Sequence, residues 1–211
     1  MSRAEPATRR SQAERRDEAE RRLLEATMAI IAEEGVSAAT FEAIGQRAGY
    51  SRGLATQHFG SKQGLIDAVV SYLHAQQDRD LQATHVAGMD GLSALQAYVS
   101  RFCAFLEFAN ERKSYFMLLS DAVADARETR ALFAQSHERV KTLLAGLIRR
   151  GQREGVIRAD IDAECSALAI GSQLLGLSMQ SLIDPVLDVA PVERAIHTHI
   201  ARSFAAGAAN G

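Results

Sequence analysis

The side chains best suited to chemistry in this sequence are the basic, amide and hydroxyl groups between Gly45 and Leu65, a stretch without any acidic residue. Arginine, glutamine and threonine can hydrogen-bond to base edges, while lysine and arginine neutralise phosphates. The residue types and their clustering therefore indicate a surface that contacts nucleic acid.

Patterns typical of enzymes are scarce. The sequence has no Glu-x-x-His for a di-iron bundle, no His-Glu-x-x-His for zinc and no Gly-x-x-x-x-Gly-Lys phosphate loop. His197 and His199 would point to different sides of a helix and make a poor metal pair. We therefore predict that the protein is not an enzyme and has no catalytic residues, metal site or cofactor.

Two short helices must position the basic stretch. Phe41 and Ile44 have helical spacing, and Gly49 ends this first helix because glycine readily adopts the left-handed conformation of a tight turn. Ser51 is a good N-cap for a second helix that ends near residue 59. Gly45 lies inside the first helix at a cost of about 1 kcal/mol, which close approach of the two helices would offset.

The second helix would turn Ala55 and Phe59 inward and expose its remaining side chains to a groove. Gly53 would let the backbone come near phosphate, and a phosphate beside Lys62 would relieve the conflict between this cation and its helix N-terminus. The alternative is an ordinary helical hairpin with a solvated basic face. The predicted DNA contacts are Thr40, Ser51, Arg52, Gly53, Leu54, Thr56, Gln57, His58 and Lys62.

The stretch from Thr40 to Leu65 resembles the DNA-binding signature of the tetracycline-repressor (TetR) family of bacterial regulators. The resemblance implies a ligand-responsive repressor that acts as a homodimer on a palindromic operator. The family commonly has tyrosine at the position of Thr56 and often an acid at that of Gln63, so the chain departs from the pattern at both. The matching residues are Thr40, the helix from Ile44 to Ala48, Gly49, Tyr50, Ser51, Gly53, His58, Phe59, Gly60, Ser61, Lys62 and Leu65.

The composition of the whole chain predicts its fold class. The chain has 211 residues and a net charge of -2, so any DNA contact must come from a local basic patch. Proline is scarce and no strand-like alternation persists, which predicts an all-α fold. We expect an N-terminal three-helix helix-turn-helix domain followed by a larger helical domain for ligand binding and dimerisation. Cys103 and Cys165 are predicted to be reduced, buried thiols in a cytoplasmic protein.

The domain prediction divides the chain into a disordered basic arm at 1–12, a DNA-binding domain at 13–60, a connecting helix at 61–84 and an effector-binding and dimerisation domain at 85–211. Arginines of the arm could follow a minor groove, although a solvated tail is the alternative. The connecting helix would transmit regulation. The expected longer helices span 13–34, 41–48, 51–59, 61–83, 91–110, 128–153, 161–183 and 191–206. A further short helix is expected to hold Tyr115, Phe116, Leu118, Leu119 and Val123.

A small apolar effector is the second predicted partner, because aromatic residues and a few polar ones converge from neighbouring helices. Plain core packing is the alternative for each of these residues. The predicted pocket consists of Phe102, Phe105, Tyr115, Phe116, Met117, His137, Gln173 and Met179.

The uncharged segment from Cys165 to Ile183 is apolar on more than one face but carries too many polar groups for a lone membrane span. It is predicted to be a buried helix of a soluble protein, in a symmetric dimer or within one subunit. The predicted dimer residues are Leu168, Leu175, Met179, Ile196, Ile200 and Phe204. A ligand-binding or protein-interaction module that has lost DNA binding, or less plausibly a helical enzyme, remains an alternative function.

Overall fold

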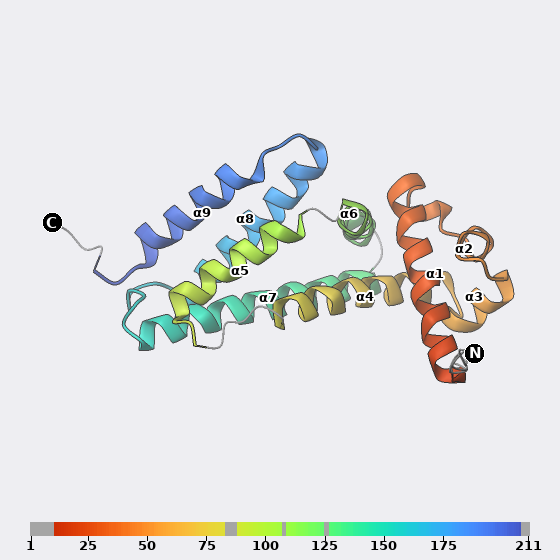
Figure 1. Ribbon diagram of the computed structural model, residues 1–211, viewed down its shortest axis with the longest axis horizontal. Coiled ribbons are helices and arrows are strands. Elements are labelled where there is room, and N and C mark those ends of the chain that lie inside the picture. The colour runs from red at the N-terminus through yellow and green to blue at the C-terminus, as the bar shows by residue number, and fades with distance from the viewer. Residues whose placement is uncertain (1–10, 83–87, 107–108, 125–126, 208–211) are drawn as a thin grey trace, which may run out of the picture.

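The computed structural model describes residues 11–82, 88–106, 109–124 and 127–207, and their regular secondary structure is helical (Figure 1). The predicted all-α fold is confirmed. One isolated bridge pairs Ile157 with Ala205. The helices are α1 (Gln12–Glu34), the 3-10 turn η1 (Val36–Ala38), α2 (Phe41–Ala48), α3 (Arg52–Phe59), α4 (Lys62–Gln82), α5 (Gly91–Phe105), α6 (Ala109–Ala124), α7 (Arg127–Arg153), α8 (Ala163–Ile183) and α9 (Val189–Phe204).

Local capping explains where the first helices begin and end. Ser11 and Glu14 form a capping box at the start of α1, and Gly35 ends that helix with a φ of 98°. The Thr40 hydroxyl accepts a hydrogen bond from the Ala43 amide at the start of α2, and Gly49 ends α2 in the left-handed conformation. The predicted extents of α1, α2 and α3 are therefore confirmed to within a residue.

Two apolar cores run along the elongated molecule. The first joins α1, α2, α3 and α4, and it also contains Leu118 and Ala122 of α6 and Phe133 of α7. The second joins α5, α7, α8 and α9 around residues such as Leu95, Ile148 and Leu174. Because α6 packs against α1 and also against α8, it spans the junction between the two ends (Figure 1).

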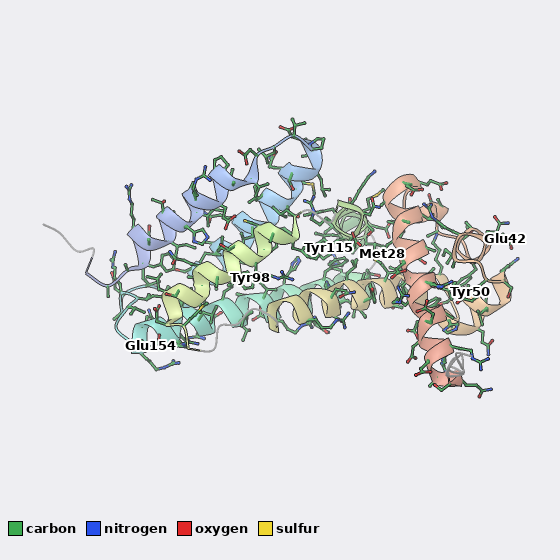
Figure 2. The ribbon with its side chains drawn as sticks, in the orientation of Figure 1. Met28, Glu42, Tyr50, Tyr98, Tyr115 and Glu154 are labelled. Atoms are coloured by element: carbon green, nitrogen blue, oxygen red, sulfur yellow. The ribbon has the colours of Figure 1, made fainter. Side chains whose placement is uncertain are left out.

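Two glycines allow α5 and α7 to touch at the end of the molecule farthest from α2 and α3. A Cβ atom on Gly91 would lie 2.2 Å from the Gly151 backbone nitrogen. The Gly91 amide donates to Glu154 Oε2 at 2.6 Å, and Glu154 is labelled at that end in Figure 2. This contact fixes the start of α5 on the last turn of α7.

Some boundaries differ from those predicted. Helix α5 ends at Phe105 instead of continuing to residue 110, while residues 107–108 lie outside the described ranges. Helix α9 begins at Val189 because the Asp188 carboxylate accepts from the Ala190 amide at 3.1 Å, which places Pro191 inside the first turn. The predicted basic arm at 1–12 lies almost wholly outside the described residues.

Helix α8 is less buried than its composition suggested. Among the described residues, α8 is the one helix that is long and apolar enough to cross a membrane. Only 28% of its most apolar stretch is buried in this subunit. Leu168 is 60% exposed and Ile183 is 68% exposed. The alternative of a helix buried wholly within its own subunit is therefore wrong for this face, while burial in a symmetric dimer stays a prediction.

The two cysteines also differ from each other. Cys103 is buried in the second core, and burial raises the pKa of its thiol to about 11. Cys165 is exposed in the first turn of α8, so the prediction that both thiols are buried is wrong for Cys165. The Asp162 carboxylate that caps this helix accepts from the Cys165 amide at 2.9 Å and raises the pKa of the Cys165 thiol.

Candidate nucleic-acid interface and cavities

The pairing of α2 with α3 depends on Gly45. A Cβ atom there would lie 2.9 Å from the Tyr50 carbonyl oxygen and 3.1 Å from the Arg52 nitrogen. The predicted close approach of the two helices is confirmed. Because Ala55 is fully buried beneath α3, the opposite side of the helix is held outward at the end of the molecule (Figure 1).

The exposed side of α3 carries the residues expected to face a groove. Arg52, Gly53, Thr56 and Gln57 are exposed, while Leu54 and His58 are half-buried. Ser51 differs from these residues, because its hydroxyl oxygen accepts from the Leu54 amide at 3.2 Å as the helix cap.

The turn from Gly49 to Gly53 has the Gly-x-Ser-x-Gly spacing found at the nucleophiles of α/β-hydrolases. That elbow joins a strand to a helix, whereas this turn joins two helices and uses its serine, Ser51, as a cap. The geometry therefore serves helix pairing and does not present a nucleophile.

Two of the predicted DNA contacts already make hydrogen bonds within the protein. The Thr56 hydroxyl donates to the Arg52 carbonyl at 3.0 Å, so its proton is not directed outward. The Lys62 ammonium donates to the Ser37 carbonyl at 3.1 Å. Since an ammonium has three donors, Lys62 still has donors available for a phosphate.

Basic residues lie in hollows on both sides of α3. On one side Thr40, Arg52 and Lys62 line a common hollow. On the other side Arg15 and Arg16 of α1 share a hollow with residues of α3 that include Gln57 and His58.

The positions of Arg15 and Arg16 were not anticipated. Their signal in the sequence is a pair of arginines in the first turns of the predicted first helix. That signal becomes informative only when the start of α1 is known to lie beside α3.

Two small cavities lie between the helices of the larger end. The first, which we name the α8 cavity, has a volume of about 120 Å³ and is lined by residues of α5, α6, α7 and α8. The second, which we name the α6 cavity, has a volume of about 70 Å³ and is lined by residues of α4, α5, α6 and α8. Phe102, Tyr115 and Leu175 line both cavities, so the two are adjacent.

The structure brings part of the predicted pocket together. His137 lines the α8 cavity, Phe105 and Phe116 line the α6 cavity, and Phe102 and Tyr115 line both. The other predicted pocket residues lie elsewhere: Met117 packs against the first core, and Gln173 and Met179 are exposed on α8.

A buried aromatic cluster forms the wall between the cavities and the first core. The Tyr115 hydroxyl lies 2.6 Å from His137 Nε2, and burial raises the pKa of this phenol. The His74 ring packs edge-on against Tyr115 and Phe133, and burial lowers the pKa of this imidazole to about 4. His74 is therefore neutral at pH 7. Figure 2 shows Tyr115 near Met28 of α1, at the junction of the two ends.

Arg112 of α6 lies at the α6 cavity and was not predicted as a functional residue. Only 7% of it is exposed, and burial lowers the pKa of its guanidinium. Its Nη1 donates to the Ser178 carbonyl at 3.3 Å and to the Ser181 hydroxyl. Its Nε is buried without a hydrogen-bond partner among the described residues.

The predicted dimer residues fall into two groups. Leu168 and Met179 are exposed, and Leu175 and Ile196 are half-buried. Ile200 and Phe204 are 0% and 7% exposed because they belong to the second core of the same subunit. These last two therefore fill their own subunit and offer almost no surface to another.

An all-helical chain that exposes the second helix of a helix-turn-helix has the architecture of one class of DNA-binding proteins. Residues 23–69 match the model of the bacterial regulatory proteins of the tetR family, and residues 93–205 match that of the C-terminal part of BetI-type transcriptional repressors. The second match covers more than half of the chain. The chain belongs to the TetR family of bacterial transcriptional regulators, and it is not an enzyme.

One protein of similar sequence and two solved structures match most of the chain. The chain is 26% identical to the transcriptional regulator TtgR of Pseudomonas putida over 172 residues, which cover 78% of this chain and 80% of that one. A TetR regulator from Chloroflexus aurantiacus shares the fold with a TM-score of 0.81 at 17% identity, over 92% of this chain and all of that chain. A regulator from Saccharomonospora viridis in complex with choline matches with a TM-score of 0.76 at 24% identity, over 90% and 98%.

Proposed function

We propose that this regulator is a repressor that binds a palindromic operator as a homodimer, and that a small ligand in its larger domain releases it. The observation that carries the DNA-binding part is the exposed polar side of α3, flanked on both sides by hollows that contain arginines. In a dimer the two α3 helices would enter successive major grooves, about 34 to 36 Å apart.

The residues of the interface would divide between positioning and base reading. Arg52 and Lys62 would contact phosphates, as would Arg15 or Arg16 on the other side of α3. Gln57, exposed in the middle of that helix, would read a base edge. Thr40 and Ser51 cap their helices, and would act mainly by holding the helix N-termini toward phosphate.

The proposed domain organisation follows these roles. Residues 13–60 would read DNA, residues 61–84 would connect, and residues 85–211 would bind the effector and the second subunit. Gln63 of α4 supports a coupled connection, because its amide donates to Asp67 at 2.8 Å and to Thr129 of α7 at 2.7 Å. A DNA-binding regulator of this kind would act in the cytoplasm.

The dimer part of the proposal is supported by the exposed side of α8. Leu168, Met179 and Ile183 follow one another along a helix that has no charged residue from 165 to 183. A symmetric pair of such helices would bury this surface against itself.

Gel shifts with DNA from upstream of the regulator's own gene test the proposal. Lys62→Ala should weaken binding to all sequences alike and reduce the salt dependence by about one phosphate contact. Gln57→Ala should change the sequence preference by about 1 to 3 kcal/mol at the affected base pair. The exposed Lys113 of α6 provides the control: Lys113→Ala should leave binding unchanged.

A ligand-binding module that has lost specific DNA binding is the second candidate. The observation that favours it is the Thr56 hydroxyl, which donates to the Arg52 carbonyl within the protein. Thr56 is also one of the two positions at which the chain departs from the family's signature. In that event Arg52→Ala and Lys62→Ala would leave the gel shift unchanged, and the repressor proposal would be overturned.

A further inference from the structure

The α6 cavity is lined by an arginine whose charge is not paired with any carboxylate among the described residues. Arg112 is only 7% exposed, and its described contacts are with a backbone carbonyl and a serine hydroxyl of α8. Within the described residues no carboxylate forms an ion pair with it. A buried cation in this state is costly for a folded protein, and buried charges are usually paired.

The hydrogen-bond donors of the Arg112 guanidinium are not all used within the protein. Nη1 is occupied by Ser178 and Ser181, whereas Nε has no partner. The edge of an arginine that includes Nε is one that a carboxylate can accept from in a bidentate manner. Arg112 lines a cavity whose other walls include Phe102, Phe105 and Phe116, and its Nε is buried in that wall without a partner among the described residues.

Among the described residues that line this cavity, Arg112 is the buried charge and Glu111 is the one acid. His74 lies behind Tyr115 and is neutral at pH 7. Lys141, at the adjacent α8 cavity, is already paired with Glu138 at 2.8 Å. Glu111 also lines the α6 cavity, but it is partly solvated, so water screens its charge more effectively than that of Arg112.

We infer that the adjoining α6 and α8 cavities together bind an effector that carries a single carboxylate on a compact apolar body. The carboxylate would accept from the Arg112 guanidinium, and the apolar body would extend past Phe102 and Leu175 into the α8 cavity. A monoanion matches one guanidinium, whereas a phosphate ester would bring nearly two charges to a single cation. The inference rests on the proposed ligand response, and it names the chemical class of the ligand.

The position of Arg112 also indicates how the ligand would reach the DNA-binding end. Helix α6 is tied to α8 through Arg112, and on its other side Leu118 and Ala122 pack in the core shared with α1. A carboxylate that reorganises the contact between Arg112 and Ser178 would shift α6 against α1. This path to α3 would operate beside the connecting helix α4.

The test compares matched ligands by calorimetry and thermal shift on the full chain. Hexanoate and phenylacetate should bind at least about tenfold more tightly than hexanamide and phenylacetamide, because the amides lose the charge-assisted hydrogen bond. Choline should not bind these cavities. Equal affinities for acids and amides, tighter binding of choline, or no binding of either acid would overturn the inference without requiring any variant.

Variants then locate the site. Arg112→Met should abolish the preference for acid over amide, Arg112→Lys should retain part of it, and Glu111→Gln should preserve or increase it. Lys113→Met removes the same charge from the next, exposed position of α6 and should change nothing. Retention of the full preference in Arg112→Met would overturn the assignment.

Gel shifts separate this inference from the proposed function. If operator DNA is bound and the acids release it at lower concentration than the amides, both hold. If operator DNA is bound but is released by amides or choline and not by acids, the carboxylate inference alone fails. If no DNA is bound, the repressor proposal fails whatever the calorimetry shows for the ligands.

Discussion

Gly53 of α3 illustrates how one residue can be favourable for DNA binding and unfavourable for folding. Gly53 is exposed in the first turn of a short helix, where glycine costs about 1 kcal/mol relative to alanine. An added Cβ would lie 3.8 Å from the nearest side-chain atom, so the protein itself has room for one. This cost is consistent with a backbone that must approach phosphate.

We therefore expect Gly53→Ala to raise the free energy of unfolding by about 0.5 to 1 kcal/mol while weakening DNA binding. Urea unfolding and gel shifts measure the two effects on the same preparation. Gly146→Ala, on an exposed part of α7 with open space around it, should stabilise by a similar amount and leave DNA binding alone. Unchanged DNA affinity in Gly53→Ala would contradict the proposed backbone contact.

His74 makes stability depend on pH. Desolvation, followed by the charges of Arg139 and His137, lowers the pKa of His74 to about 4 from 6.5. Between these values the unfolded chain binds a proton that the folded chain does not, so stability falls as the pH falls from about 6.5 to 4. The loss between pH 6.5 and 4 amounts to about 3 kcal/mol. We expect His74→Phe to abolish it, because the phenyl ring does not titrate and keeps the packing against Tyr115 and Phe133.

Urea unfolding of the wild type and His74→Phe at several pH values between 4 and 7 checks this expectation. The exposed His199 provides a matched substitution, since His199→Phe also replaces a histidine by phenylalanine but lies outside the aromatic cluster around Tyr115. If the free energy of unfolding depends on pH in the same way in the wild type and in His74→Phe, the pKa of His74 is not lowered in the folded protein.

At the scale of elements, most helices could be predicted because periodicity and caps agree with the packing. Leu23, Thr27 and Ile31 share one predicted side of α1, and all three are fully buried. The pairing of α2 with α3 could be predicted equally well, because a glycine inside a short helix and a second glycine at its end are typical of two helices in close contact.

The candidate site was less predictable, because its chemistry depends on contacts between distant helices. Arg112 reads as a surface residue in a polar stretch of α6, and its burial follows only from the packing of α6 against α8. Ile200 and Phe204 illustrate the converse problem. An apolar helical stripe does not reveal whether it packs within its own subunit or against another, and both residues fill their own core.

The close approach of α2 and α3 leads to a prediction about Gly45. A methyl group would meet the backbone at 2.9 to 3.1 Å, and backbone cannot move aside as a flexible side chain can. Overpacking of this kind costs about 1 to 3 kcal/mol. Replacing glycine by alanine inside a helix gains about 1 kcal/mol of helix propensity, so the overpacking cost should be the larger effect at Gly45. We expect Gly45→Ala to lower the free energy of unfolding and to weaken DNA binding by moving α3.

The same measurements on Gly146→Ala provide the comparison, since that glycine is also helical but has open space around it. A glycine-to-alanine change should thus have opposite signs at the two positions in urea unfolding. Stabilisation of both variants would contradict the close approach at Gly45.

At the scale of the whole molecule, α6 and α4 connect the two ends in different ways. Helix α6 shares the first core with α1, whereas α4 is linked to α7 through the hydrogen bonds of Gln63 with Asp67 and Thr129. A ligand that moves α6 therefore acts on the packing beneath α3, and α4 constrains how far the DNA-binding end can turn. The response of a dimer would depend on both.

The proposed dimer provides the last prediction. The exposed stripe of α8 combines Leu168, Met179 and Ile183 with small or polar neighbours and no charge, so two copies can approach closely. In a symmetric contact each substitution is present twice, and Leu168→Glu would place two carboxylates in an apolar interface. We expect this variant to be monomeric at micromolar concentration, by sedimentation, where the wild type is dimeric.

Loss of the dimer has a measurable consequence at the operator. Two linked α3 helices bind a palindrome with an avidity about 100-fold or more above that of one, so Leu168→Glu should bind a full operator about as weakly as a half-site. Val123 is 65% exposed on α6, away from this stripe, and Val123→Glu should remain dimeric and bind normally. If Leu168→Glu stays dimeric, the stripe on α8 does not form the interface, and the spacing of the two α3 helices must be set by another surface.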